Sequence, residues 1–84
     1  MEYYILCHVD EDVIRFVEEY ERDENGKMIF STTGSFNSAF SFDDLEYARK
    51  VARKITHKND KDGNYVCSVS VKSSKFIIEH NLNY

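Results

Sequence analysis

The chain has 84 residues and a mass of 9.9 kDa, which leaves room for a single domain, residues 1–84, with one hydrophobic core. It is 42% hydrophobic and 14% aromatic, too rich for a disordered chain, and it contains no apolar run of the ~18 residues that span a membrane. The net charge of −4 is unevenly distributed: residues 1–46 carry twelve acids and three bases, whereas residues 47–84 carry eight bases and three acids.

The start of the chain lacks the positively charged segment and apolar stretch of a signal peptide. Two cysteines are also too few for the disulfide framework of a small secreted domain. We therefore expect a cytoplasmic protein with two reduced, buried thiols. A disulfide between Cys7 and Cys67 is the alternative, if their strands are neighbours.

The first half of the chain has the composition of strands. Residues 3–9 are a continuous apolar run that predicts a strand buried on at least one face. Residues 13–22 are ambiguous, because they alternate like a strand but also contain one helical stripe at i, i+3, i+4 and i+7. That stripe consists of Val13, Phe16, Val17 and Tyr20.

A turn signal favours the strand for residues 13–22. Asn25-Gly26 tolerates the positive φ angles of a two-residue hairpin turn, and the β-rich residues 27–33 follow it. We therefore predict a hairpin. Residues 34–42 then form a connection with three Phe rings, which we expect to hold it against the core.

Residues 43–57 are the clearest segment and predict an amphipathic helix. Ser41 with Asp44, or Asp43 with Glu46, supplies a capping pattern. The apolar stripe should face a sheet, and it consists of Leu45, Ala48, Val51, Ala52 and Ile55.

Residues 65–72 alternate and predict another strand, with Tyr65, Cys67 and Val69 on one face. Residues 75–80 are a candidate fifth strand. The predicted fold is α+β, a small antiparallel β-meander in the order β-β-β-α-β with one helix packed on one face. The other face should be solvated or covered by a partner.

No constellation for catalysis or metal binding is present in the sequence. Cys7 and His8 are neighbours and would point to opposite faces of a strand, and no Cys or His pair has zinc-finger spacing. Glycine-rich phosphate-binding motifs are missing. We expect a protein that is not an enzyme and that needs no metal or cofactor.

Five acids occur within residues 18–24. One interpretation is an edge strand that charge protects from aggregation. The other is that the acids imitate a row of phosphates and dock into a basic groove on another protein. The candidate partner-binding residues are Glu18, Glu19, Tyr20, Glu21, Asp23 and Glu24.

The predicted helix has a basic face that could contact phosphates, formed by Arg49, Lys50, Arg53 and Lys54. A solvated helix face is the simpler interpretation. Direct nucleic-acid binding is not expected, because the acidic hairpin would repel the same backbone.

Three stretches together carry a resemblance: YYILCHVDEDVIRFVEEYE, GKMIFSTTGSFNSAFSF and DDLEYARKVARKI. The chain resembles small proteins encoded by phages and prophages of Gram-positive bacteria, some of which are anti-CRISPRs that block a Cas effector by direct binding. The resemblance implies an inhibitor of a host defence nuclease that acts in the bacterial cytoplasm. It assigns no binding residues. The alternative is a small homodimeric regulatory or structural module that uses the uncovered sheet face.

Overall fold

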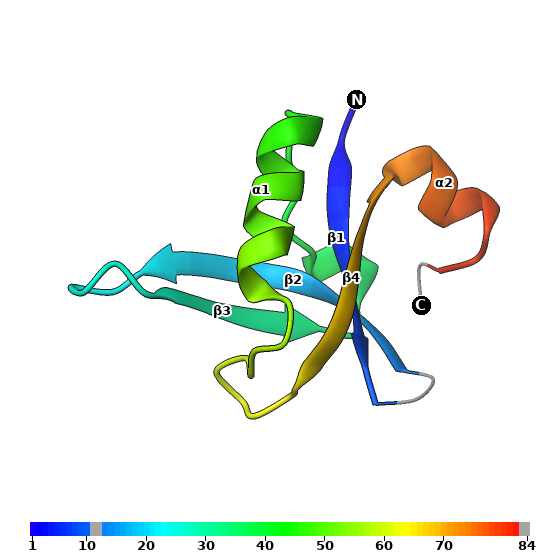
Figure 1. The fold of residues 1–84 in the computed structure, drawn as a ribbon. Coiled ribbons are helices and arrows are strands. Elements are labelled where there is room, and N and C mark those ends of the chain that lie inside the picture. The colour runs from blue at the N-terminus through cyan, green and yellow to red at the C-terminus, as the bar shows by residue number, and fades with distance from the viewer. Residues whose placement is uncertain (11–12, 83–84) are drawn as a thin grey trace.

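The computed structural model describes residues 1–10 and 13–82, which form an α+β fold with one four-stranded antiparallel sheet (Figure 1). The sheet order is β3-β2-β1-β4, so the chain forms a meander and then adds its last strand beside the first. The strands are β1 (Tyr3–Val9), β2 (Val13–Arg22), β3 (Met28–Thr33) and β4 (Val66–Ser73). This confirms the predicted fold class, and residues 13–22 are a strand rather than a helix.

Helix α1 (Leu45–Ile55) is two residues shorter at each end than predicted. It begins after Asp44, whose carboxylate accepts hydrogen bonds from the backbone N–H groups of Glu46 and Tyr47. Neither predicted capping pair forms the cap, because Asp44 serves as the N-cap alone. The helix ends at Ile55, since the next residue is extended.

The predicted stripe of α1 faces the sheet. Val51 is 3% exposed and Ile55 is fully buried, and they pack against Ile5 and Cys7 of β1 in the larger core cluster. Burial of one such side chain contributes roughly 1.5–3 kcal/mol to stability.

The second face of the sheet is covered as well, contrary to expectation. Residues 75–80 do not form a strand, because they lie in helix α2 (Ser74–Glu79) and its C-cap. Ser73 is the N-cap of this helix, and its hydroxyl accepts a hydrogen bond from the Phe76 N–H. Ile77 of α2 and the short 3₁₀ helix η1 (Phe36–Ser38) pack over this face. The face considered for a homodimer is therefore part of the core.

A β-bulge in β2 explains why its sequence fits two templates. Val17 pairs with Thr32 and Glu19 with Ser31, so Glu18 is an extra residue in the ladder. The bulge puts Val17 and Tyr20 on the same side of the sheet, toward α1. Two apolar residues three apart thus share a face in a strand.

A second irregularity overturns the predicted alternation of β4. His8 pairs with Ser68 but Val9 pairs with Val66, so Cys67 is the extra residue. As a result Val66 is fully buried, whereas Tyr65 is 46% exposed and Cys67 is exposed.

Past the bulge, β2 leaves β1 and pairs with β3 alone. The connection after η1 fills the gap: the Phe40 N–H donates to the Val17 carbonyl at 2.9 Å, and Tyr3 and Phe42 exchange two bonds of 2.8 Å. Residues 19–31 therefore form a two-stranded arm, which extends to the left in Figure 1.

The arm ends in a longer loop than the predicted two-residue turn. The Asp23 N–H donates to the Lys27 carbonyl at 2.9 Å, and residues 24–26 lie between them. The Asp23 carboxylate accepts from the N–H groups of Asn25 and Lys27. Gly26 has a φ of 80°, the left-handed conformation that glycine adopts without strain.

Candidate functional site

The six candidate partner-binding residues do not form one surface. Past the bulge, alternation places Glu19 and Glu21 opposite Ser31 and Ile29, on the face of the arm that points away from α1. Tyr20 lies on the α1 face. We call the face of Glu19 and Glu21 the acidic face.

Glu18, Asp23 and Glu24 complete the predicted set. Glu18 is the extra residue of the bulge and is half-buried, and Glu24 is exposed at the tip of the arm. The carboxylate of Asp23 is already engaged by two backbone N–H groups of the loop. Asp23 therefore shapes the arm.

Tyr20 anchors the arm to the body of the domain. Its ring stacks on Phe42 with centroids 5.6 Å apart, and its hydroxyl forms a 2.9 Å hydrogen bond with the Tyr47 hydroxyl of α1. Burial, together with the hydrogen bond that the Tyr20 hydroxyl donates to Tyr47, raises the pKa of Tyr20 to about 12, so this phenol stays neutral.

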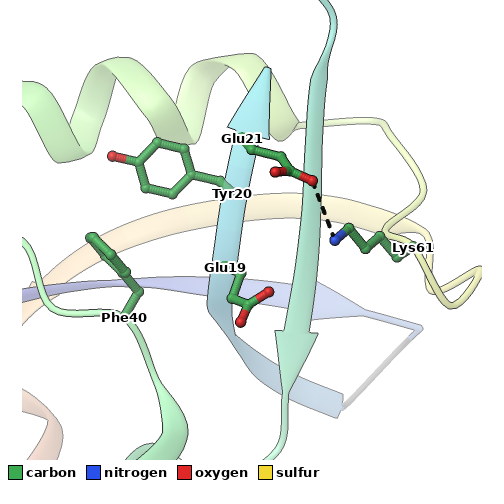
Figure 2. Close-up of a pocket in the computed structure, with 5 residues that line it drawn as sticks. All are labelled: Glu19, Tyr20, Glu21, Phe40 and Lys61. Atoms are coloured by element: carbon green, nitrogen blue, oxygen red, sulfur yellow. Dashed lines mark ion pairs between the residues drawn. The ribbon is translucent and has the colours of Figure 1, made fainter. Parts of the chain in front are cut away.

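A hollow of about 260 Å³ lies at the base of the arm (Figure 2). It is lined by Glu19, Tyr20, Glu21, Phe40 and Lys61, and we call it the acidic–aromatic pocket. Figure 2 shows Lys61 reaching Glu21 across β3, with Tyr20 and Phe40 on the other side of β2. The Phe40 side chain is large, apolar and 39% exposed.

The two carboxylates of this pocket differ in their pairing. The Glu21 carboxylate lies 3.6 Å from the Lys61 ammonium, and both side chains are well exposed, at 66% and 42%. Such a pair contributes only ~0.2–1 kcal/mol. Glu19 is exposed and forms no ion pair within 4 Å in the described part of the chain.

Lys61 is positioned by a loop that Asp60 organises. The Asp60 carboxylate accepts from the Thr32 hydroxyl, from the backbone N–H groups of Asp62 and Asn64, and from the Asn64 amide. The Lys61 N–H donates to the Phe30 carbonyl at 2.9 Å, which ties the loop to the edge of β3.

The charge of Asp60 is stabilised in this setting. Burial raises the pKa of its carboxyl, but the hydrogen bonds from Thr32, Asn64 and Asp62 outweigh that effect and hold the pKa below its ordinary value. Asp60 is therefore ionised at neutral pH.

Phe40 and Lys61 were not singled out as site residues from the sequence. The sequence predicts that Phe40 packs against the core with the other rings of its segment, and Lys61 lies in a short charged turn. Their approach to Glu19 depends on the bulge and on the Asp60 loop, and neither has a periodic sequence signal.

The two thiols have different environments. Cys7 is fully buried, and burial, followed by the charge of Asp60, raises its pKa to about 12. Cys67 is exposed, which corrects the expectation that both are buried, and the two cysteines are free. A thiol like that of Cys7 is a poor nucleophile. Among residues 1–10 and 13–82, no three His, Cys, Asp or Glu side chains gather to hold a metal ion.

Comparison of the chain with protein-family models, with curated proteins and with solved structures found no match. In the ranges that the structure describes, no helix has the length and apolar character to cross a membrane.

Proposed function

We propose that this chain is a non-catalytic interaction module that binds a basic surface of a partner protein through the acidic face of its arm. One observation carries the proposal: the unpaired carboxylate of Glu19 lines the same hollow as the exposed ring of Phe40. The arm extends from the body of the domain (Figure 1), and both Glu19 and Phe40 are exposed to a second protein.

The pocket suits an arginine side chain. A guanidinium can donate two parallel hydrogen bonds to a carboxylate and can stack on an aromatic face. Lys61 already brings a cation to Glu21 from within the chain. A partner arginine would take the place beside Glu19 and would compete with Lys61 for Glu21.

The resemblance to phage-encoded inhibitors supports a partner class. A nuclease of bacterial defence, such as a Cas effector, must hold nucleic acid with arginine and lysine side chains, and those side chains are the chemistry that the acidic face would recognise. On this proposal the protein acts in the cytoplasm of a bacterial host and inhibits the nuclease by occupying its cleft.

A labelled hexa-arginine peptide tests the pocket through fluorescence anisotropy. Glu19→Gln should weaken binding roughly fivefold, about 1 kcal/mol, because it removes a charge-assisted hydrogen bond. Glu79→Gln is the matched control, since Glu79 is exposed on α2 and its loss changes the net charge equally. Lys61→Gln should tighten binding, because it frees Glu21.

An equal loss in Glu19→Gln and Glu79→Gln would mean that only net charge attracts the peptide, and the pocket assignment would be wrong. Capture from a bacterial lysate then tests the partner class. Wild type and Glu79→Gln should both retain a basic nuclease, and Glu19→Gln/Phe40→Ala should release it. A capture pattern that is the same for all three baits would contradict the proposed function.

A further inference from the structure

A second surface lies on the opposite side of the arm, between β2–β3 and α1. Two adjoining hollows of about 410 and 300 Å³ share Arg22, Met28 and Lys54 in their linings. Because the two hollows adjoin along these three residues, we call them together the basic groove. Met28 and Val51 are buried along it, so its base is apolar.

The rim of this groove is strongly cationic. The arm, α1 and the turn after α1 contribute six cations, which are Arg22, Lys27, Lys50, Arg53, Lys54 and Lys58. The lining contains a single carboxylate, that of Glu21, which lies 3.6 Å from Lys61. None of the six cations forms an ion pair within 4 Å with any residue the structure describes.

We propose that the basic groove binds the phosphodiester backbone of a single-stranded nucleic acid. Six unpaired cations around one groove repel one another, and a chain of phosphates would neutralise them together. Tyr47 also lines the groove and is 48% exposed, so it offers an aromatic surface on which a base can stack.

The arrangement of charge on the arm removes the main objection to such binding. Because residues alternate along β2, Arg22 faces the groove, whereas Glu19 does not line it and belongs to the opposite face of the arm. Glu21 is the one acidic residue of the arm in the groove lining, and its carboxylate lies 3.6 Å from the Lys61 ammonium, which offsets its charge.

The lining of the groove favours a single strand over the other polyanions. Its walls are one helix and a two-stranded arm, and the exposed ring of Tyr47 can stack on an unpaired base, whereas the bases of a duplex are already stacked on one another. A membrane surface would require exposed apolar side chains between the cations, but Met28 and Val51 are 8% and 3% exposed. A carboxylate chain could pair with the cations but would gain nothing from Tyr47.

The test is the binding of fluorescein-labelled dT12 and U12 to the full chain by anisotropy. Six phosphate contacts predict a slope of log K against log salt near −4, which is a loss of roughly 300-fold between 50 and 200 mM salt. Arg22→Gln/Lys54→Gln should weaken binding about 25-fold at 0.1 M salt, because the loss of two phosphate contacts reduces the number of counterions released on binding.

The matched control is Arg49→Gln/Lys75→Gln, which changes the net charge equally. Arg49 and Lys75 are exposed and pair with Glu46 and Glu79, at 2.8 and 3.9 Å. This control should keep wild-type affinity for dT12. Circular dichroism verifies that both double variants are folded.

Three results would overturn the inference: no binding of dT12 or U12 at 50 mM salt, equal loss in the two double variants, or a tighter complex with a 12-base-pair duplex. Competition by poly-glutamate at equal charge would instead assign the groove to an acidic protein segment. Glu19→Gln should leave dT12 affinity intact, so failure of the groove and failure of the acidic–aromatic pocket are separate outcomes.

Discussion

Asp60 shows how one buried carboxylate can position a surface site. It is 6% exposed, and its hydrogen bonds close the loop that carries Lys61 to Glu21. Because those bonds favour the ionised form, the ordering of the loop depends on the charge of Asp60. By placing Lys61 beside Glu21, the buried carboxylate of Asp60 thus determines that Glu21 is paired while Glu19 remains unpaired on the acidic face.

Stability should therefore depend on pH through Asp60. Its pKa in the folded state lies below the ordinary 3.8, so its contribution is complete above that value and is lost as the pH falls through the folded-state pKa. Asp60→Asn should lose ~1–3 kcal/mol at pH 7 and should change less than wild type between pH 5 and pH 2. Urea unfolding followed by circular dichroism measures both.

Asp62→Asn is the control in the same loop. Its side chain is exposed and accepts no hydrogen bond from any residue that the structure describes. It should unfold like wild type at every pH. A pH profile of Asp60→Asn that runs parallel to wild type would mean that the charge of Asp60 plays no part in the fold.

At the scale of elements, the hydrophobic pattern was enough to predict the helix and the strand whose buried residues follow one regular spacing. The stripe of α1 and the apolar run of β1 were enough to place them, because each keeps one face buried along its length. The strand assignment of β2 came from Asn25-Gly26. The two bulges were not predictable, since an extra residue at Glu18 or Cys67 shifts the alternation without changing composition.

Helix α2 and the grouping of the site residues were not predictable for related reasons, because both depend on tertiary contacts. Residues 74–79 form a short segment with three apolar residues and no clear period, and the Ser73 cap and the burial of Ile77 favour the helix. The acidic residues were found as a set, but their division between a pocket and a loop depends on tertiary contacts. The basic groove combines α1 with Arg22 and Lys27, whose distance along the chain hides the cluster.

Val51 tests the layer between α1 and the sheet. Val51→Asp would place an unpaired charge in the main core, which should lower the free energy of unfolding by ~3 kcal/mol or more, a large part of the 5–15 kcal/mol that holds a domain together. Lys50→Asp, one residue away on the exposed side, should lower it by less than ~1 kcal/mol. Equal thermal midpoints for Val51→Asp and wild type would mean that the helix face is misassigned.

At the scale of the whole molecule, charge is separated across a thin structure. The domain measures 39 × 28 × 19 Å, and the arm presents carboxylates on one face and lines a cationic groove with the other. The three ion pairs within 4 Å in the described ranges are exposed. Two of them each lie within a single helix and the third joins Lys61 to Glu21, so none joins the acidic face to a cation of the groove. On each surface, the like charges therefore still repel one another and remain able to bind a partner of opposite charge.

This separation predicts an unusual response to salt. Screening should relieve like-charge repulsion on both faces while losing only three weak ion pairs, so the thermal midpoint of wild type should rise between 20 and 300 mM NaCl.

Arg22→Gln/Lys50→Gln should raise the midpoint at 20 mM NaCl by ~2–4 °C, since removing like-charge contacts gains ~0.5 kcal/mol, and should reduce the rise with salt. Glu46→Gln/Arg49→Gln, which removes one exposed pair at constant net charge, should behave like wild type. Differential scanning calorimetry measures all three.

The double variant separates local repulsion from net charge. Loss of two cations takes the net charge from −4 to −6, so a stability governed by net charge would fall at low salt, whereas one governed by crowding in the groove would rise. A rise would show that the wild-type chain retains cations that destabilise it, the trade-off expected of a binding surface. A midpoint that falls with added salt in wild type would instead mean that attraction between the two faces stabilises the fold, and the groove cations would need no ligand to account for them.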